Sequence, residues 1–560
     1  MEQYREKYEC WKTNAFFDKE TRAELAALND EKEIRERFYK DLEFGTGGLR
    51  GILGAGSNRM NKYNVRKATT GFGLFLLEKY GDEAKRRGIA VAHDCRRFSA
   101  EFAKETALTM NALGIPVCLY EMISATPLLS FTVCDLNCVG GVVITASHNP
   151  KIYNGYKAYD ETGCQLNLED ADAVIAKVNA TDITKTVIMN ETDAKEAGLL
   201  HILDEKELER FLAAVQEQAH PTDAAAKREL KIVYTPLHGA GCVPVQEVLK
   251  RQGFAHVSPV EAQCVPDGSF PTVVSPNPEE KTALTMAIAQ AKAEGAELVL
   301  ATDPDSDRIG IAVWNPEEKD FQLFSGNQTG AMLADYILTR RASSISPKTR
   351  LITTIVTSSF GPACAASHGV ATDLVLTGFK HICGKINAYE KTGEAEFFMG
   401  YEESYGYMTG NYVRDKDGVL SAMLIAEMAA YYKAQGKNLC QVLDGLYEKH
   451  GYYLDMQDSY YFEGIEGAEK IRSINAGLRE IGTDLMPGIR EIKDYSSGID
   501  GLPGSDVLKY FFADGSWIAI RPSGTEPKIK LYYCIHAKTR EEAEVLLKDK
   551  KACMDRFVNA

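Results

Sequence analysis

The chain has 560 residues, of which 45% are hydrophobic and 26% are charged. This length and composition predict several folded domains and exclude a disordered chain. The 79 acidic residues outnumber the 64 basic ones, for a formal charge of −15. No nucleic-acid partner is therefore expected, because a global basic field is lacking.

The cysteines and the N-terminal residues indicate in which cell compartment the protein is expected. The 13 cysteines include no C-x-x-C pair, a pattern typical of reduced thiols rather than of a disulfide framework or a zinc ribbon. The first residues are charged and lack an apolar core, and no apolar run approaches the roughly 18 residues of a membrane span. We therefore expect a cytoplasmic protein without a signal peptide or a membrane partner.

Short apolar runs alternate with amphipathic helices along most of the chain. Residues 1–40 are rich in Glu, Lys, Arg and Ala at helical spacing and predict a helical N-terminal extension. After it come the runs Ile89–Ala92, Val142–Thr145, Ile232–Tyr234, Leu298–Ala301, Leu351–Val356 and Leu374–Leu376, each followed by a polar loop. This order predicts α/β layers with mainly parallel strands, whose ligands bind beyond the carboxyl ends of the strands.

The order of predicted elements changes in the C-terminal segment, from about residue 456. There, Tyr460–Phe462, Val507–Phe512, Trp517–Ile520 and Ile529–Ile535 are predicted strands of a small α+β unit that ends in a Glu/Lys-rich helix. We predict a first domain over 41–205, with residues 1–40 as its extension. The second domain is expected over 206–322, the third over 323–455 and the fourth over 456–560.

The loop Thr145–Pro150 reads Thr-Ala-Ser-His-Asn-Pro and directly follows an apolar strand. A serine at a strand end, in a turn braced by Asn149 and Pro150, is presented as a nucleophile would be. The alternative is an ordinary turn with a capping serine. His148 is interpreted as a phosphate or substrate contact, because adjacent residues on a turn seldom point at one another.

The loop Thr302–Arg308 carries Asp303, Asp305 and Asp307 at alternate positions. Three hard oxygen ligands in a curled loop suit Mg²⁺ and leave room for a phosphate oxygen. Asp residues that merely cap a turn are the alternative. An EF-hand is excluded because Arg308 and Trp314 stand at its glycine and glutamate positions.

Three further loops offer groups for a phosphorylated sugar. Gly400–Gly406, followed by Arg414–Gly418, combines carboxylates and hydroxyls suited to vicinal hydroxyl groups. Arg521–Pro527 combines a guanidinium, hydroxyls and a glycine in a phosphate cradle. Phe44–Gly51 is rich in glycine and contains Arg50, but does not match a nucleotide P-loop. Phosphoryl transfer on a phosphorylated polyol uses all of these loops.

In this order the loops resemble the four signatures of the α-D-phosphohexomutase superfamily. These are T-x-S-H-N-P with N-G-x-K shortly after it (here Asn154–Lys157), D-x-D-x-D-R, G-E-x-S-G and R-x-S-G-T. The resemblance runs from about residue 40 to residue 535. The segments Phe44–Gly51, Ser275–Glu279 and Leu376–His381 are similar to bacterial phosphoglucomutases and to the animal phosphoglucomutase-2/phosphopentomutase branch.

The resemblance implies a fold and an activity. The fold is three successive mixed α/β domains plus a smaller C-terminal α+β domain around a central active-site cleft. The implied enzyme is an isomerase of the phosphoglucomutase kind. Ser147 would carry a phosphoryl group and pass it between glucose 1-phosphate and glucose 6-phosphate through glucose 1,6-bisphosphate. One Mg²⁺ per chain would be held by the phosphorylated Ser147 with Asp303, Asp305 and Asp307.

The resemblance also implies the roles of individual residues. The catalytic set would be Ser147, Lys157, Arg50 and His148. Lys157 is the leading general acid/base, which requires a lowered pKa. The substrate-binding set would be Thr46, Arg308, Thr377, Gly378, Lys380, Glu402, Ser404 and Lys416, with Arg521, Ser523, Gly524 and Thr525 on the phosphate that is not transferred. Small sugar phosphates are the only partners expected, and no obligate protein partner is evident.

Other activities stay open at this point. The same mechanism can serve a phosphopentomutase acting on ribose or deoxyribose 1-phosphate, or a phosphomannomutase. A haloacid-dehalogenase-type enzyme would use an aspartyl nucleophile in the metal loop, but it wants D-x-D-x-[TV], and this chain has Asp307 at the last slot. A sugar-phosphate sensor would be expected to have lost Ser147 or the metal loop.

Overall fold

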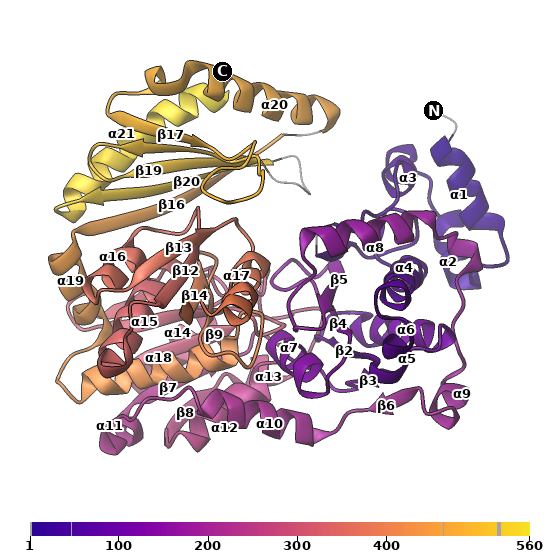
Figure 1. The fold of residues 1–560 in the computed structure, drawn as a ribbon, viewed down its shortest axis with the longest axis horizontal. Helices are drawn as coiled ribbons and strands as arrows, with labels where there is room; N and C mark the ends of the chain where they lie inside the picture. Colours follow the sequence, from indigo (N-terminus) through magenta and orange to yellow (C-terminus); the bar gives the residue numbers. More distant parts are fainter. Residues whose placement is uncertain (1–2, 46, 463, 523–527, 560) are drawn as a thin grey trace. The chain divides into compact units, whose positions relative to one another are not determined.

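The computed structural model describes residues 3–45, 47–462, 464–522 and 528–559, and in these residues the strands form four sheets (Figure 1). The chain divides into two compact units. The first unit contains Met1–Phe324, Cys383–Thr392 and Gly406–Gln435. The second contains Ser325–Ile382, Gly393–Tyr405 and Gly436–Ala560.

Three short helices precede the first sheet: α1 (Gln3–Thr13), α2 (Lys19–Ala26) and α3 (Glu31–Phe38). Asp18 and Asp30 cap α2 and α3 by accepting hydrogen bonds from backbone N–H groups of the first turn. The aromatic rings of Trp11 and Phe17 stack at 4.2 Å and pack against Tyr63 of α4 (Lys62–Tyr80). The extension therefore has a small core of its own that seats it on the first domain.

The first sheet has the order β1 (Gly48–Ile52), β5 (Tyr153–Asp160), β4 (Gly140–Ile144), β2 (Ile89–His93), β3 (Val117–Leu119) and β6 (Leu200–Ile202). The neighbouring strands β4, β2, β3 and β6 run parallel to one another, while β5 is antiparallel to both of its neighbours, β1 and β4. Every residue of β2 and β4 is buried, as expected for strands covered on both faces. The covering helices α4, α6 (Ser99–Ala112), α7 (Thr126–Asp135) and α8 (Leu168–Ala180) follow the predicted strand–loop–helix order.

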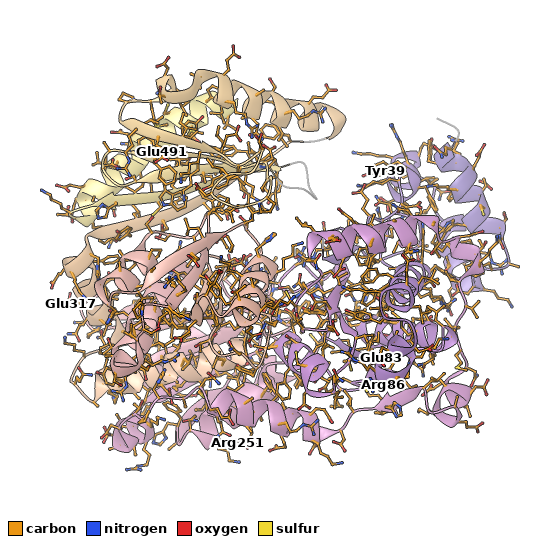
Figure 2. The ribbon with its side chains drawn as sticks, in the orientation of Figure 1. Tyr39, Glu83, Arg86, Arg251, Glu317 and Glu491 are labelled. Atoms are coloured by element: carbon orange, nitrogen blue, oxygen red, sulfur yellow. The ribbon has the colours of Figure 1, made fainter. Side chains whose placement is uncertain are left out.

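The second sheet has the order β11 (Asp320–Phe324), β10 (Ile309–Asn315), β9 (Leu298–Thr302), β7 (Lys231–Thr235) and β8 (His256–Pro259). β9, β7 and β8 are parallel, and β10 returns antiparallel beside β9. Glu317 marks the turn between β10 and β11 (Figure 2). Helices α12 (Cys242–Arg251), α14 (Thr285–Glu294) and α18 (Gly418–Lys433) pack on this sheet. Thus α18 comes much later in the chain but packs on the second sheet.

The third sheet contains the parallel strands β13 (Ala371–Val375), β12 (Thr349–Thr354) and β14 (Glu396–Glu402). Helix α15 (Gly326–Arg340) and helix α16 (Phe360–Ser367) pack together beside it. The ring of Tyr401 lies where a side chain on Gly330 or Gly361 would have to be, so these two glycines make room for it. Tyr401 is therefore a core residue of this domain.

The fourth sheet is antiparallel, in the order β16 (Tyr452–Tyr461), β20 (Lys528–Ala537), β19 (Trp517–Pro522), β18 (Leu508–Phe512) and β17 (Ile489–Asp494). Alternate residues of these strands form a core with α20 (Gly464–Ile481) and α21 (Arg540–Asn559) on one face. On the other face, Trp517, Ala519 and Cys534 pack against Ile355 and Leu376 of the third domain. The last two domains of the chain therefore share an apolar joint.

The described residues contain further helices and strands. They are α5 (Asp82–Arg87), η1 (Ile183–Lys185), α9 (Glu191–Glu196), α10 (Glu205–Gln216), α11 (Ala224–Glu229), α13 (Glu261–Cys264), η2 (Ala342–Ser344), α17 (Phe379–Thr392), β15 (Gly406–Met408), α19 (Leu439–His450) and η3 (Gly482–Leu485). Glu83 and Arg86 of α5 form an ion pair on the surface (Figure 2). Within the described residues, no helix is both long and apolar enough to cross a membrane.

The predicted fold class of three mixed α/β domains and a C-terminal α+β domain is confirmed. The exact domain boundaries and the central cleft stay predictions.

Candidate active site

Ser147 lies in a constrained turn at the carboxyl end of β4. Its backbone has φ of 50°, in the left-handed region that non-glycine residues rarely occupy and that is common at functional sites. The Ser147 N–H donates to Thr145 Oγ1 over 2.8 Å, and Thr145 Oγ1 donates to Asp94 Oδ2 over 2.7 Å. Side-chain bonds to the backbone thus hold the turn, and the serine is only 3% exposed.

Arg96 stabilises the same turn through hydrogen bonds. Its guanidinium donates to the carbonyl oxygens of Ser147 and Asn149 and, over 3.1 and 3.2 Å, to those of Pro150 and Tyr153. It also pairs with Asp94 at 3.2 Å, and both side chains are fully buried. One buried cation therefore donates to four carbonyl groups of this segment.

Asp303, Asp305 and Asp307 converge in the loop between β9 and β10. One oxygen from each lies within 4.8 Å of the others, and all three residues are buried. Ser147 Oγ donates to Asp303 Oδ2 over 2.6 Å, so the predicted nucleophile and the predicted metal loop meet. Asp305 Oδ1 and Asp307 Oδ1 are buried with no hydrogen-bond partner among the described residues. Free carboxylate oxygens at this spacing fit a divalent cation, so the donor set can hold a metal.

Four cationic side chains surround this carboxylate loop. Lys157 Nζ, on β5, donates to Asp305 over 2.7 Å and to Asp307 over 3.0 Å. Lys416 Nζ lies 3.2 Å from Asp307 and 3.0 Å from Asp415.

The two arginines come from the end of the carboxylate loop itself and from β1. Arg308 pairs with Glu279 at 3.2 Å. Arg50, on β1, donates to Asn149 over 3.1 Å. Its position follows from the antiparallel register that places Arg50 opposite Gly155 of β5.

Burial and charge act in opposite directions on the carboxyl groups. Burial, together with Asp305 and Asp307, raises the pKa of Asp303 well above its ordinary value. Burial also opposes ionisation of Asp307, but Lys157, Lys416 and Arg308 outweigh it and lower the pKa of that carboxyl. The carboxyl groups of the loop therefore differ in how easily they ionise: Asp307, which faces the lysines, ionises more readily than Asp303.

The cations and the imidazole of the site respond to the same balance. Burial works against the charge of Lys157, but Asp305 and Asp307 outweigh it and raise its pKa, the opposite of the lowering predicted for a general base. Burial and the neighbouring arginines hold the pKa of His148 far below its ordinary value. His148 Nδ1 lies 3.3 Å from Ser147 Oγ, so the adjacent imidazole does reach the serine hydroxyl. In a neutral imidazole, Nδ1 either donates or accepts this hydrogen bond, depending on the tautomer.

The second unit holds another group of the predicted residues. Gly378, with φ of 118°, donates its N–H to Glu402 Oε1 over 2.9 Å, which ties the loop after β13 to the end of β14. Thr377 precedes this glycine, and Lys380 lies in the first turn of α17. Ser404 follows Glu402 at the end of β14.

Arg521 belongs to the same unit and lies near the end of β19. Burial first, and then the charges of Lys380 and Arg521, lower the pKa of His381 to about 4. Lys380 and Arg521 thus form one positively charged neighbourhood. The predicted residues Thr46, Ser523, Gly524 and Thr525 lie outside the described residues.

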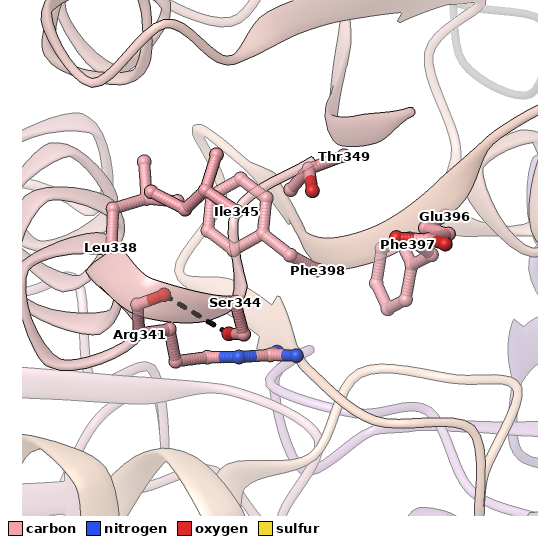
Figure 3. Close-up of a pocket in the computed structure, with 8 residues that line it drawn as sticks. All are labelled: Leu338, Arg341, Ser344, Ile345, Thr349, Glu396, Phe397 and Phe398. Carbon is pink, nitrogen blue, oxygen red and sulfur yellow. Dashed lines mark hydrogen bonds between the residues drawn. The ribbon is translucent and has the colours of Figure 1, made fainter. Parts of the chain in front are cut away.

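A small cavity in the third domain is not part of this site. Its volume is about 30 Å³, and it lies at the amino ends of β12 and β14 (Figure 3). It is lined by Leu338, Arg341, Ser344, Ile345, Thr349, Glu396, Phe397 and Phe398. The predicted sugar contacts lie instead after the carboxyl ends of β13 and β14, where ligands of parallel sheets bind.

Several residues that hold the site together were not singled out in the sequence. Asp94 and Arg96 hold the serine turn, and Thr126 Oγ1 donates to Asp305 Oδ2 over 2.8 Å. Asp415 accepts hydrogen bonds from Tyr159 over 2.8 Å and from Lys416. A usable signal existed for one pair: Asp94-Cys95-Arg96 begins one residue after the predicted strand Ile89–Ala92, in the position that the other site loops have after their strands.

In this site a serine hydroxyl is hydrogen-bonded to a carboxylate loop that can hold a metal, and lysine and arginine side chains lie close by. Such an arrangement is typical of phosphoryl-transfer enzymes. Models of the phosphoglucomutase/phosphomannomutase domains match the chain in order. Domain I matches residues 41–185, domain II 209–315, domain III 325–450 and the C-terminal domain 466–549.

Whole proteins match as well. A phosphoglucomutase of Staphylococcus haemolyticus is 34% identical over 90% of this chain and 92% of its own length. The fold is similar to that of parafusin, a phosphoglucomutase from Paramecium, with a TM-score of 0.71 at 18% identity over 93% of this chain and 95% of the other. A phosphoglucomutase/phosphomannomutase family protein from Burkholderia thailandensis gives 0.68 at 19% identity over 92% and 97%. The chain belongs to the phosphoglucomutase/phosphomannomutase family, and the resemblance found in its loops is confirmed.

Proposed function

We propose that this enzyme is a phosphoglucomutase that interconverts glucose 1-phosphate and glucose 6-phosphate through a phosphorylated Ser147 and a glucose 1,6-bisphosphate intermediate. The observation that carries the proposal is the 2.6 Å bond between Ser147 Oγ and Asp303, inside a ring of four cations. A phosphoryl group on Ser147 would lie in the same neighbourhood as Lys157, Lys416, Arg308 and Arg50. Such transition states are loose and highly charged, so positioning and charge neutralisation dominate catalysis.

The metal is proposed to be one Mg²⁺ per chain. Asp303, Asp305 and Asp307 would hold it together with an oxygen on Ser147, because Asp305 Oδ1 and Asp307 Oδ1, which accept no hydrogen bond among the described residues, supply hard ligands. When bound, the ion neutralises charge on the phosphoryl oxygens. Lys157 pairs with Asp305 and Lys416 with Asp307, so both lysines partly neutralise the proposed metal ligands.

The chain's own groups divide the remaining work. Arg50, Lys157 and Arg308 approach the serine from separate strands and loops, so they can contact a phosphoryl group from different sides. His148 would orient the Ser147 hydroxyl through its 3.3 Å contact. Lys157 is assigned the general acid role, because its Nζ carries a proton and lies beside the reacting serine loop.

Substrate binding is assigned to the second unit, together with Lys416. The bond between Gly378 N and Glu402 holds the two loops whose Thr377, Lys380 and Ser404 are the proposed contacts of the sugar. Arg521, with Ser523, Gly524 and Thr525, is proposed to bind the phosphate that is not being transferred. The charges of Lys380 and Arg521 support this, because both act on His381 from within one unit.

The test has two independent readouts. Intact mass and peptide mapping should find one phosphate, on Ser147, that resists hydroxylamine, whereas an aspartyl phosphate of the haloacid-dehalogenase kind would be cleaved. Rates on glucose 1-phosphate, mannose 1-phosphate and ribose 1-phosphate, with bisphosphate activator, should rank glucose first. A faster rate on mannose or ribose phosphate would reassign the enzyme to phosphomannomutase or phosphopentomutase.

We also propose that the enzyme is cytoplasmic. It would need no protein partner to complete its site, since each predicted functional residue comes from this one chain. The domain boundaries 41–205, 206–322, 323–455 and 456–560 are kept as proposals. Limited proteolysis that cuts first near 205, 322 or 455 would support them.

A further inference from the structure

Helix α7, which packs on β2 and β4 of the first sheet, contacts the carboxylate loop through its first residue, Thr126. The Thr126 backbone N–H donates to the Asp305 carbonyl over 2.8 Å, and Thr126 Oγ1 donates to Asp305 Oδ2, also over 2.8 Å. Both residues are fully buried. Since Asp305 lies in the loop between β9 and β10, this double contact joins the layer that carries Ser147 to the loop of the second sheet.

The two carboxylate oxygens of Asp305 differ in their hydrogen bonds. Oδ2 accepts from Thr126 Oγ1 over 2.8 Å and from Lys157 Nζ over 2.7 Å. Oδ1 is buried and has no hydrogen-bond partner among the described residues. A carboxylate oxygen has two lone pairs, so the two donors occupy Oδ2 and leave Oδ1 as the oxygen that can still bind a ligand.

We propose that Thr126 is a positioning residue for the metal: its hydroxyl fixes the plane of the Asp305 carboxylate, so that Oδ1 stays clear of the protein's donors and available to Mg²⁺. This role rests on the proposed metal site and adds to it a residue that would contact neither the ion nor the substrate. The last torsion of an aspartate side chain is broad, so a carboxylate turns readily when few donors hold it. The ammonium group of Lys157 sits on a long flexible stem and can follow such a turn, whereas the hydroxyl at the start of a packed helix cannot.

The Thr126 hydroxyl does not cap the helix that it begins. A serine or threonine that caps a helix accepts a hydrogen bond from a backbone N–H of the first turn. Here the N-cap residue is Ala125, which makes no side-chain cap bond, and the Thr126 hydroxyl donates to Asp305 instead. Pro127 follows, and proline suits the first turn of a helix because it needs no N–H partner there. The hydroxyl therefore serves the carboxylate loop and not the local helix.

Thr126 differs from Ser147 and Lys157, which also donate to this loop. Ser147 Oγ donates to Asp303, and Lys157 Nζ donates to Asp305. Under the proposed function both take part in the reaction, Ser147 as the phosphoryl carrier and Lys157 as the general acid, so their hydrogen bonds to the aspartates change during the catalytic cycle. The Thr126 hydroxyl is neutral and has no part in these steps. Its hydrogen bond can therefore hold Asp305 in one orientation throughout the cycle.

The substitution Thr126→Val isolates this effect. It removes the hydroxyl but keeps a side chain of nearly the same shape, together with the backbone N–H that bonds to the Asp305 carbonyl. The loop should therefore stay in place while the carboxylate is free to turn. Hydrogen-bond partners of metal ligands typically change metal affinity by 10- to 100-fold when they are lost, so Mg²⁺ should bind Thr126→Val about 10- to 100-fold more weakly than the parent.

The first experiment titrates Mg²⁺ into the full chain by calorimetry. Thr126→Ser keeps the hydroxyl and should bind Mg²⁺ as the parent does. Thr132→Val is the matched control, because Thr132 lies on the same helix, is equally buried, and bonds through its hydroxyl to Tyr120 and to the Leu128 carbonyl. It should keep the parent's Mg²⁺ affinity. Each valine variant loses a buried hydroxyl, so both should lower the unfolding midpoint of the metal-free protein by similar amounts, about 2–4 °C.

The second experiment separates positioning from a general structural role by measuring mutase rates over a range of Mg²⁺ concentrations. In Thr126→Val the concentration that gives half the maximal rate should rise about 10- to 100-fold. The rate at saturating Mg²⁺ should stay within about 3-fold of the parent, because excess metal compensates for weaker binding.

Three outcomes would count against this role. An unchanged Mg²⁺ affinity in folded Thr126→Val, or an equal loss in Thr126→Ser, would overturn it. A loss of rate that saturating Mg²⁺ does not restore would show that Thr126 acts on the structure and not through the metal. A parent chain that binds no Mg²⁺ would refute the proposed metal itself, and the role of Thr126 with it.

Discussion

Replacing Arg96 by Met should damage the enzyme without touching any group proposed to contact substrate. The substitution keeps much of the side-chain length but removes the guanidinium that holds the carbonyls of Ser147, Asn149, Pro150 and Tyr153. It also leaves the Asp94 carboxyl buried without its ion-pair partner. The turn that carries Ser147 in its left-handed conformation would lose its principal brace.

The size of the effect follows from the burial of the pair. Removing one partner of a buried ion pair costs about 3–5 kcal/mol. Burial already raises the pKa of Asp94, so this carboxyl can take up a proton and avoid part of the cost. We therefore expect a loss near the lower end, about 3 kcal/mol, which for a domain of this size lowers the unfolding midpoint by roughly 6–12 °C. Misplacing the serine by about 1 Å should lower kcat/KM by roughly 100-fold.

The assay combines differential scanning calorimetry with mutase rates at a temperature where all variants are folded. The matched control is Arg97→Met, since Arg97 is the exposed neighbour in sequence. It should leave both readouts within error of the parent. The double variant Asp94→Asn/Arg96→Met removes the uncompensated carboxyl, so it should regain part of the stability but not the rate. A variant Arg96→Met with the parent's midpoint and rate would refute the role of the brace.

Four further outcomes are expected. Ser147→Ala should lose at least roughly three decades of mutase rate and all bound phosphate by intact mass, and an active alanine variant would contradict the nucleophile. Asp305→Asn should weaken Mg²⁺ binding at least about tenfold by calorimetric titration while the fold is kept, and full activity after exhaustive chelation would exclude the metal. Arg521→Ala should lower kcat/KM by about 10- to 150-fold, equally for glucose 1-phosphate and glucose 6-phosphate, and a loss on one substrate alone would show that the residue reads one orientation. Burial raises the pKa of Asp417 to about 6, so its ionisation destabilises the fold increasingly as pH rises from about 4 to about 6. Asp417→Asn keeps the helix cap and should therefore raise the unfolding midpoint more at pH 7.5 than at pH 4.5, and equal gains would contradict this.

The strands that were predicted from the sequence are those whose hydrophobic pattern matches their burial in the fold. The strands β2, β4, β7 and β9 are buried on both faces and therefore read as continuous apolar runs. By contrast, β17 has the sequence Ile-Arg-Glu-Ile-Lys-Asp and was not predicted, because an edge strand of an antiparallel sheet can be half charged. The start of β16 at Tyr452 also lies eight residues before the predicted strand at Tyr460.

The site shows the same division. Ser147 and the three aspartates stand in short, specific motifs, so their proximity could be expected before any fold was known. The bond between Thr126 and Asp305 and the contact between Lys416 and Asp307 join segments distant in the chain. Only tertiary structure brings such groups together, and their residue types are common in any loop. The raised pKa of Lys157 could not be foreseen either, because it depends on which carboxylates lie next to its Nζ.

The order in which the site is assembled has a consequence for synthesis. The backbone N–H of Gly418 donates to the Ser306 carbonyl over 3.0 Å, and Lys416 reaches Asp307, so the segment before α18 forms one wall of the carboxylate loop. That wall leaves the ribosome about a hundred residues after the aspartates, several seconds later at typical elongation rates of roughly 5–20 residues per second. During this interval the nascent second domain lacks both Lys416 and the covering helix α18. A fragment that ends after β11 would leave the apolar surface beneath α18 exposed, and a chaperone should bind it until the third domain has been translated.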